Sequence, residues 1–277
     1  METRTNYVKD KVVIITGAAG GFGVLTAKRV AQLGGKPVLA DIKENKLIEA
    51  VEEIKAAGGE ASYVVTDVSK RAEVFNMVKY TVDTYGRVDV LVNNAGLMPL
   101  GFFAQHEQGL DKWEECIDVS IKGTLFGICA VYDQMMAQGQ GQVINVSSIY
   151  SNYPIAGAGV YQVAKMGVQY LADSLRSECQ GKIKVSTIKP TGFTRTGLMQ
   201  TVVDPNAGSD IASDLIGIGE QYENMTGRPD YHDINSIRYC DPDPQILADN
   251  IVYLIDQPWG VNVSDITVRA SGDFFAI

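Results

Sequence analysis

The chain has 277 residues, of which 45% are hydrophobic and 21% charged, and it carries a net charge of -9. This composition is typical of a globular protein with a full core, and without a run near the ~18 consecutive apolar residues of a membrane span it excludes an integral membrane protein. The acidic balance without a basic cluster excludes nucleic acid as an expected partner, and the polar N-terminus lacks a signal-peptide pattern, which favours a cytoplasmic location.

Seven short apolar runs recur along the chain and predict seven β-strands. Their apolarity is continuous rather than alternating, which is typical of strands covered on both faces, and the spacers are long enough for crossover helices. We therefore predict one doubly wound α/β domain over residues 1–277, with a seven-stranded parallel sheet and helices on both faces. The runs are KVVIIT, KPVLAD, ASYVVTD, VDVLVNN, QVINVSS, IKVSTIKP and SDITVRA.

Amphipathic stretches between these runs predict six helices, over residues 22–33, 44–57, 70–85, 110–137, 160–179 and 245–255. Between the sixth strand and the last helix the chain makes a long excursion rich in proline and glycine, and such excursions in compact domains usually serve as functional lids. We predict a substrate lid around residues 191–240. Its apolar side chains are Phe193, Leu198, Met199, Ile211, Leu215, Ile216, Ile218 and Met225.

The first predicted strand runs directly into TGAAGGFG, in which Gly17, Gly21, Phe22 and Gly23 form the turn into a helix. Glycines let the backbone approach a pyrophosphate closely, and the free amides and dipole of the following helix favour negative charge. A tight structural turn is the alternative. The strand before the glycines and the helix after them favour nucleotide binding.

Two acidic residues follow the next two strands. Asp41 ends the second strand about twenty residues beyond the glycines, where a carboxylate can accept hydrogen bonds from ribose hydroxyls and repel a 2′-phosphate. NAD is therefore predicted, and nearby Lys43 keeps NADP as the less favoured alternative. Asp67 ends the third strand, with Val68 beside it, and is predicted to meet the adenine edge. A helix cap or a loop carboxylate is its alternative role.

Tyr161 and Lys165 stand four residues apart in YQVAK, after Ser148 at the end of an apolar strand. On a helix they share a face, so the ammonium lies near the phenol and favours its ionised form, which lowers its pKa. Tyr161 can then exchange a proton at neutral pH, while the Ser148 hydroxyl donates to the same carbonyl oxygen. A surface pair is the alternative, but the serine and the glycine turn favour a hydride-transfer site.

Together these motifs resemble the short-chain dehydrogenase/reductase family over nearly the whole chain. The resemblance implies a doubly wound Rossmann fold, a small-molecule substrate, and assembly as homodimers or homotetramers. It also implies that the tyrosine is the acid/base, that the lysine lowers its pKa and binds the nicotinamide ribose, and that the serine orients the substrate. The matching positions are residues 16–23, Asp41, Asp67, Asn93, Asn94, Ala95, Gly96, Ser148, Tyr161 and Lys165.

Three features depart from the family pattern. Ser120 stands where the family usually has an asparagine that holds a water in a proton relay behind the lysine, and a hydroxyl is shorter but can still donate and accept. After Pro190 the sequence reads TGFTRT, so Thr194 or Thr196 could take the place of the family's threonine near the nicotinamide carboxamide. The C-terminal DITVRASGDFFAI lacks the family's common acidic-glycine-glycine ending.

Cysteines and histidines add no further site. The four cysteines lack metal-ligand spacing, so neither a metal site nor a disulfide is predicted. His106 and His232 lie in loops without a partner at metal-ligand spacing and are not assigned to catalysis.

Aromatic and apolar residues after two of the strands predict the substrate class. Core packing is an equal alternative for each, but with the lid they indicate a roomy apolar pocket that fits a cyclic or steroid-like alcohol or ketone. The predicted protein is an NAD(H)-dependent dehydrogenase, with a hydroxysteroid as first expected substrate. The alternatives are an NADPH-dependent carbonyl or acyl-carrier reductase, and a nucleotide sensor that has lost the reaction. The residues are Met98, Leu100, Phe102, Phe103, Tyr150 and Tyr153.

Overall fold

The computed structural model describes residues 5–193, 195–204 and 228–273, and these contain a seven-stranded sheet. All neighbouring strands pair in parallel, in the order β3-β2-β1-β4-β5-β6-β7. The predicted doubly wound fold is therefore confirmed. The strands are β1 Val12–Thr16, β2 Lys36–Asp41, β3 Ser62–Val65, β4 Val90–Asn93, β5 Gly141–Val146, β6 Ile183–Pro190 and β7 Asp265–Val268.

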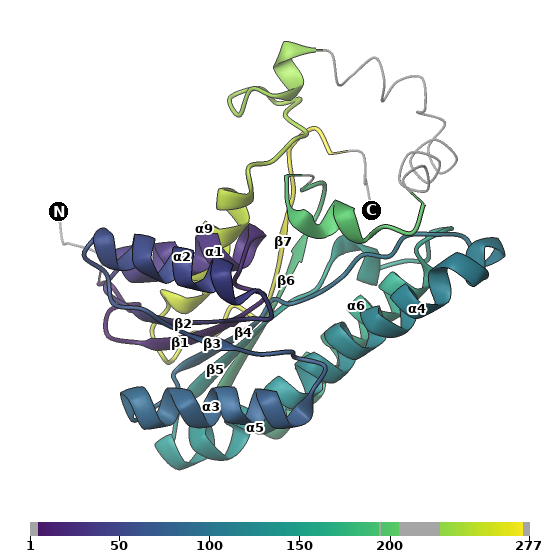
Figure 1. Ribbon diagram of the computed structural model, residues 1–277. Helices are drawn as coiled ribbons and strands as arrows, with labels where there is room; N and C mark the ends of the chain where they lie inside the picture. The colour runs from purple at the N-terminus through teal and green to yellow at the C-terminus, as the bar shows by residue number, and fades with distance from the viewer. Residues whose placement is uncertain (1–4, 194, 205–227, 274–277) are drawn as a thin grey trace.

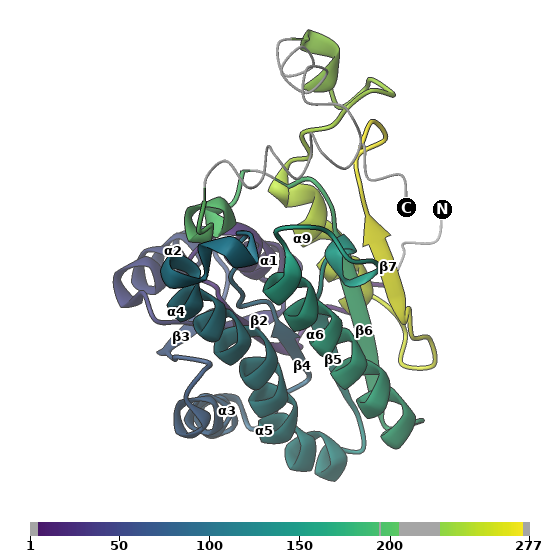
Figure 2. The ribbon, with the colours of Figure 1, turned by 90° about the vertical axis from the view of Figure 1, so that its right-hand side faces the viewer.

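Helices cover both faces of the sheet (Figure 1). They are α1 Gly21–Gln32, α2 Glu44–Ala56, α3 Arg71–Tyr85, α4 His106–Ile117, α5 Gly123–Gln138, α6 Gly159–Glu178 and α9 Pro244–Ile255. Short 3₁₀ turns are η1 Phe103–Gln105, η3 Ile149–Ser151, η4 Gly197–Thr201 and η5 Pro229–Tyr231. Helices α1, α2 and α9 lie on one face, and α3, α4, α5 and α6 lie on the other. In the turned view, α4 with α5 runs beside α6 (Figure 2).

The core forms two layers because side chains alternate along each strand. In β1, Val13 and Ile15 pack with the α1 side, whereas Val12 and Ile14 pack with the α3 side. Every residue of β1 is buried. Burial on both faces explains why these strands have unbroken runs of apolar residues.

The longest predicted helix, 110–137, differs from the structure. It begins earlier, at His106, and the π-helical turn η2 Asp118–Lys122 separates α4 from α5. A π turn inserts one extra residue without changing composition, so the hydrophobic pattern does not reveal it, and such turns are frequent at functional sites. Ser120 lies in the middle of this turn. The other predicted helix ends are correct to within one residue.

Two predicted strand ends are also corrected. β3 ends at Val65 and β5 at Val146, so Asp67 and Ser148 lie in the loops that follow. Both residues remain at the carboxyl edge of the sheet, because the loops leave the strands there.

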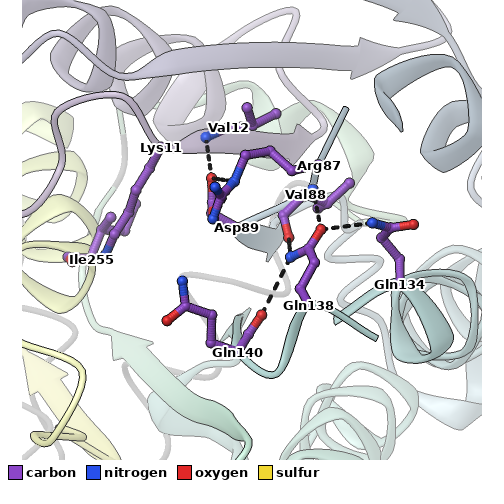
Figure 3. Close-up of polar contacts among 9 residues, drawn as sticks. All are labelled: Lys11, Val12, Arg87, Val88, Asp89, Gln134, Gln138, Gln140 and Ile255. Carbon is purple, nitrogen blue, oxygen red and sulfur yellow. Dashed lines mark hydrogen bonds and ion pairs between the residues drawn. The ribbon is translucent and has the colours of Figure 1, made fainter. Parts of the chain in front are cut away.

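A buried polar network closes the amino ends of the strands (Figure 3). Asp89, with 3% of its side chain exposed, pairs with Arg87 at 2.5 Å and accepts from the Val12 backbone N–H at 2.9 Å. The Gln138 amide accepts from the Val88 N–H at 3.0 Å and donates to the Val88 carbonyl at 2.8 Å. These contacts connect β1, the start of β4 and the end of α5, so this end of the sheet is tied by protein groups.

A buried lysine also lies at the amino end of the sheet. Lys184 on β6 is 8% exposed and donates to the carbonyls of Gln257, Pro258 and Val261 at 3.4, 3.4 and 3.1 Å. Its ammonium lies 5.0 Å from the ring centroid of Trp259. Burial lowers the pKa of Lys184 to about 8.

Candidate active site

A cavity of about 780 Å³ lies at the carboxyl ends of the strands, where the strand order reverses between β1 and β4. Ligands of doubly wound sheets bind at this switch point. The cavity brings together most of the residues singled out in the sequence. Those that line it are Gly17, Gly21, Phe22, Asp41, Asp67, Val68, Asn94, Ala95, Gly96, Tyr161, Lys165 and Pro190.

The glycine turn packs its backbone against neighbouring segments. Gly17 has a φ of +66°, in the left-handed region, and a Cβ there would lie 2.9 Å from Ala95 Cα. A Cβ on Gly23 would lie 2.4 Å from the Gly17 carbonyl oxygen. Only glycine fits at these two positions, and its lack of a side chain at Gly23 lets α1 pack directly against the turn at Gly17.

The amino end of α1 is open toward the cavity. This helix is described in full, and it has neither a side-chain cap nor an acidic residue in its first turn. Its first amides have no partner within the helix, and Gly20, Gly21 and Phe22 line the cavity. The turn can therefore bind an anionic group such as a pyrophosphate.

Asp41 ends β2, as predicted, at the edge of the cavity. Its Oδ2 accepts from the Ala19 N–H at 3.2 Å, and its Oδ1 accepts from the Lys43 N–H at 3.0 Å. The two amides hold the carboxylate beside the glycine turn. That position suits a group that reads ribose hydroxyls.

Asp67 lies in the loop after β3 and closes a turn there. Its Oδ1 accepts from the Ser69 N–H at 2.9 Å and from the Ser69 hydroxyl at 2.7 Å, which closes an Asx turn. α3 begins only at Arg71, so Asp67 is a loop carboxylate and not a helix cap. It also lines the cavity.

The NNAG segment joins β1 to β4. The Thr16 hydroxyl accepts from the backbone N–H groups of Asn94 and Ala95 at 3.0 and 3.1 Å. The Asn94 side chain donates to the Thr16 carbonyl at 2.8 Å and to the Gly17 carbonyl at 3.2 Å. Asn94 therefore fixes the glycine turn at the switch point.

The structure brings Ser148, Tyr161 and Lys165 together. On α6, Lys165 Nζ lies 5.9 Å from the ring centroid of Tyr161, and the two residues are 5% and 3% exposed. Ser148 caps η3, where its Oγ accepts from the Tyr150 N–H at 3.2 Å, and it also hydrogen-bonds with Tyr161. The Ser147 hydroxyl donates to the Lys165 carbonyl at 2.9 Å and so ties α6 to the end of β5.

The pKa of Tyr161 is shifted in the direction opposite to the one expected from sequence. Burial raises it, and the hydrogen bond with Ser148 only partly opposes the rise. Burial also lowers the pKa of Lys165 to about 8, and Lys165 Nζ donates to the Val146 carbonyl at 2.9 Å. The expected lowering is wrong for the protein alone, because burial disfavours the charged phenolate.

Ser120 lies behind Lys165. It is 1% exposed, and among the described residues its Oγ makes no hydrogen bond of good geometry. A Cβ on Gly96 would lie 3.1 Å from Lys165 Nζ and 3.7 Å from Ser120 Oγ, so both atoms reach the same point. The Cys116 thiol adjoins them: burial raises its pKa, while the Lys165 charge and the Ser120 hydroxyl oppose the rise.

The sequence did not predict one wall of the cavity, and it predicted a second wall only as part of the lid. η4 lines the cavity, and it belongs to the predicted lid, whose residues Thr194, Ile211, Leu215, Ile216, Ile218 and Met225 lie outside the described ranges. The missed wall is an acidic row on α4 and the first residue of η2, whose i, i+3, i+4, i+7 spacing is readable in the sequence. The row consists of Asp111, Glu114, Glu115 and Asp118.

The comparisons with known proteins agree with this geometry. The sequence matches the short chain dehydrogenase family over residues 11–207. It is 35% identical over 264 residues to an uncharacterized oxidoreductase of Listeria innocua, covering 94% of this chain and 96% of that protein. It is 38% identical over 200 residues to an uncharacterized oxidoreductase of Thermotoga maritima, covering 72% and 78%. The chain belongs to the short-chain dehydrogenase/reductase family and is an oxidoreductase of that family.

Solved structures with this fold bind both nicotinamide nucleotides. A short chain dehydrogenase/reductase of Burkholderia phymatum in complex with NAD has a TM-score of 0.75, 25% identity, and coverage of 95% of this chain and 90% of that one. A variant of actinorhodin polyketide ketoreductase with NADPH has a TM-score of 0.77, 25% identity, and coverage of 96% and 98%. The choice between the nucleotides therefore depends on this chain's own residues.

The described ranges hold neither a candidate metal site nor a candidate membrane span. No group of at least three His, Cys, Asp or Glu side chains there could hold a metal ion. No helix in that part of the chain is long and apolar enough to cross a membrane.

Proposed function

We propose that this oxidoreductase uses NAD(H) to move hydride between nicotinamide and a secondary alcohol or ketone. The observation that carries the proposal is the Asp41 carboxylate, held by two backbone amides at the rim of the cavity that contains Tyr161 and Lys165. The close-packed glycines and the open end of α1 fit a dinucleotide's pyrophosphate. When bound, the nucleotide supplies the hydride acceptor or donor.

The protein's residues supply positioning and a proton route. Tyr161 donates its phenolic proton to the carbonyl oxygen during reduction and takes a proton back during oxidation. Its raised pKa keeps it protonated, which is the form that ketone reduction needs. Ser148 donates a hydrogen bond to the same oxygen as negative charge develops there.

Lys165 and Ser120 act behind the tyrosine. After the bond to Val146, the Lys165 ammonium has further N–H groups for the nicotinamide ribose. We propose that the ordered charge then draws the pKa of Tyr161 down. We propose that the buried Ser120 hydroxyl, which has no hydrogen-bond partner among the described residues, takes the relay position of the family's asparagine.

Replacing Asp41 tests the choice of nucleotide. Asp41→Arg removes a charge that repels the 2′-phosphate and adds one that attracts it, so the ratio of NADP to NAD efficiency should rise by about tenfold or more. Glu52→Arg, exposed on α2 and outside the cavity, is the matched control for added charge. An unchanged preference in Asp41→Arg would refute the assignment.

We further propose a bulky apolar substrate, with a hydroxysteroid as the first choice. Tyr161 lies in an apolar cluster with every strand-following residue named in the sequence except Phe103, and a cyclic carbon skeleton would suit the cavity beside this cluster. Turnover of small polar polyols instead of hydroxysteroids and bulky cyclic ketones would contradict this substrate class. The cluster contains Leu97, Met98, Leu100, Phe102, Tyr150, Tyr153 and Val202.

An NADPH-dependent carbonyl or acyl-carrier reductase is the second candidate. The similar polyketide ketoreductase was solved with NADPH, and Lys43 and Lys70 line this chain's cavity. Faster turnover with NADPH, on ketones or acyl thioesters, would favour it. A nucleotide sensor without activity would bind NADH yet turn over no substrate.

We propose that the chain pairs as a homodimer or homotetramer through the face of α4, α5 and α6 (Figure 2). A cluster of exposed apolar side chains on one face is typical of an interaction surface. Light scattering should give a multiple of 30.0 kDa for the wild type and a smaller species for Tyr170→Glu. A monomeric wild type would contradict the pairing. The exposed residues are Leu110, Ile117, Leu125, Val163, Met166 and Tyr170.

We propose a cytoplasmic location for the protein. All four cysteines are free thiols, which supports the cytoplasmic location expected from sequence.

A further inference from the structure

Residues 191–193 and 195–204, called the strap from here on, run from the end of β6 across the glycine turn. Gly192 has a φ of +66°, and the Phe193 ring that follows meets the Phe22 ring edge to face, with centroids 5.3 Å apart and an interplanar angle of 90°. Thr196 lies over Gly21, where an added Cβ would be 3.7 Å from the threonine Cβ. The strap therefore contacts the start of α1 directly.

The far end of the strap is held by the loop after β4. The Thr201 hydroxyl accepts from the Met98 N–H at 2.8 Å, and the Val203 N–H donates to the Leu100 carbonyl at 3.0 Å. Leu198, Gln200 and Thr201 line the cavity between the two contacts. A ligand in the cavity thus lies against the strap, which is anchored on both sides.

The order of the strands divides the cavity into two halves. Asp41 and Asp67 follow β2 and β3, on one side of the switch point, and mark the half for adenosine. Tyr161 and Lys165 pack beside the end of β5, on the other side, and Pro190 at the end of β6 lines the cavity with them. Phe193 follows Pro190 in the loop after β6, so its contact with Phe22 joins the glycine turn to the half of the cavity that contains Tyr161 and Lys165.

We propose that Phe193 is a positioning residue for the nicotinamide half of the cofactor. This inference rests on the proposed function. Phe22 lines the cavity, whereas the half-buried Phe193 packs on the core beside it and fixes the orientation of the Phe22 ring. Edge-to-face pairs restrict both rings, so the wall of this half is formed before the cofactor arrives.

Binding of NADH and of ADP-ribose, which lacks the nicotinamide ring, tests the proposal by calorimetry. Phe193→Leu should weaken NADH binding by about three- to tenfold and change ADP-ribose binding by less than about twofold. Phe22→Leu combined with Phe193→Leu should lose less than the two single variants together, because the pair acts as a unit. Phe75→Leu, 45% exposed on α3, is the matched control and should bind both ligands like the wild type.

Other binding results would contradict the role of Phe193 or the proposed function. Equal losses of NADH and ADP-ribose affinity would overturn the inference, because the strap would then hold the whole nucleotide or the fold. Unchanged NADH affinity in Phe193→Leu would overturn it as well, while the proposed function would stand. A wild-type protein that binds no NADH would overturn the proposed function itself. Phe193→Ala, with a larger loss on NADH alone, would support the inference further.

Discussion

The two ends of the sheet hold buried lysines of similar pKa in opposite surroundings. Burial lowers the pKa of Lys184, at the amino end, and of Lys165, at the carboxyl end, to about 8. Lys184 donates to three carbonyls and lies over Trp259, whereas Lys165 donates to the Val146 carbonyl and faces the cavity. Burial alone therefore does not mark a functional site. A functional site is indicated instead by a buried group, such as Lys165, whose N–H donors remain available beside a cavity.

Two carboxylates, Asp89 and Asp41, differ in the same way between the two ends of the sheet. Asp89 at the amino end is paired with Arg87 and buried, so its charge is balanced by the protein. Asp41 at the carboxyl end is held by the amides of Ala19 and Lys43 and lines the cavity. One end of the sheet is built for stability, and the other is built to receive a ligand.

Removing the Tyr161 hydroxyl should have the largest effect. Tyr161→Phe takes away the proposed acid/base, so kcat should fall by roughly 10²–10⁴-fold while NADH affinity changes by less than about threefold. Steady-state rates and NADH titration measure the two quantities. Tyr85→Phe, on α3, is the control and should keep full activity. Undiminished turnover in Tyr161→Phe would show that the catalytic assignment is wrong.

Breaking the amino-end network should affect stability and not catalysis. Asp89→Ala leaves the buried Val12 N–H without its acceptor, so the free energy of unfolding should fall by roughly 1–3 kcal/mol. Denaturant unfolding measures this loss, and KM for the nucleotide should stay unchanged. A changed KM with normal stability would break the contrast between the two ends.

The two lysines should differ in their effect on the pH dependence of binding. Lys165 has a pKa of about 8, below its ordinary value of 10.5, so it loses its charge as pH rises through 8. Wild-type NADH affinity should therefore fall above pH 8, by up to about tenfold per pH unit. Lys165→Met should abolish this slope, and Lys184→Met should keep it. An identical slope in Lys165→Met would assign the titration to another group.

Crowding Lys165 should have the smallest effect. Gly96→Ala places a Cβ 3.1 Å from Lys165 Nζ, so the ammonium must shift by a few tenths of an ångström. We expect KM for the nucleotide to rise by about threefold, because small displacements of positioning groups are felt in binding and rate. Gly260→Ala, with nothing within 4 Å of the added Cβ, is the control. An unaltered KM in Gly96→Ala would mean that Lys165 tolerates displacement.

The sequence predicted what local spacing controls. Unbroken apolar runs indicated parallel strands, the glycine spacing indicated the turn at Gly17, and the four-residue spacing placed Lys165 beside Tyr161. Asp41 was correctly placed at the end of β2 because strand length fixes its position.

Long-range packing accounts for what the sequence did not predict. The pKa of Tyr161 depends on how deeply α6 is buried, and the spacing of residues does not contain that information. The Phe22–Phe193 pair joins residues that are far apart in the sequence, and the π turn at Ser120 inserts a residue into an otherwise regular helix. Such features require the assembled structure.

The most direct test of the proposed function is absorbance in the reduced-nicotinamide band, with NAD or NADP and a panel of hydroxysteroids, cyclic secondary alcohols, polyols and the matching ketones. An NAD-dependent dehydrogenase should turn over the bulky cyclic members with NAD and lose this turnover in Tyr161→Phe. Faster turnover with NADP, or NADH binding without turnover of any member, would contradict the proposed NAD-dependent dehydrogenase.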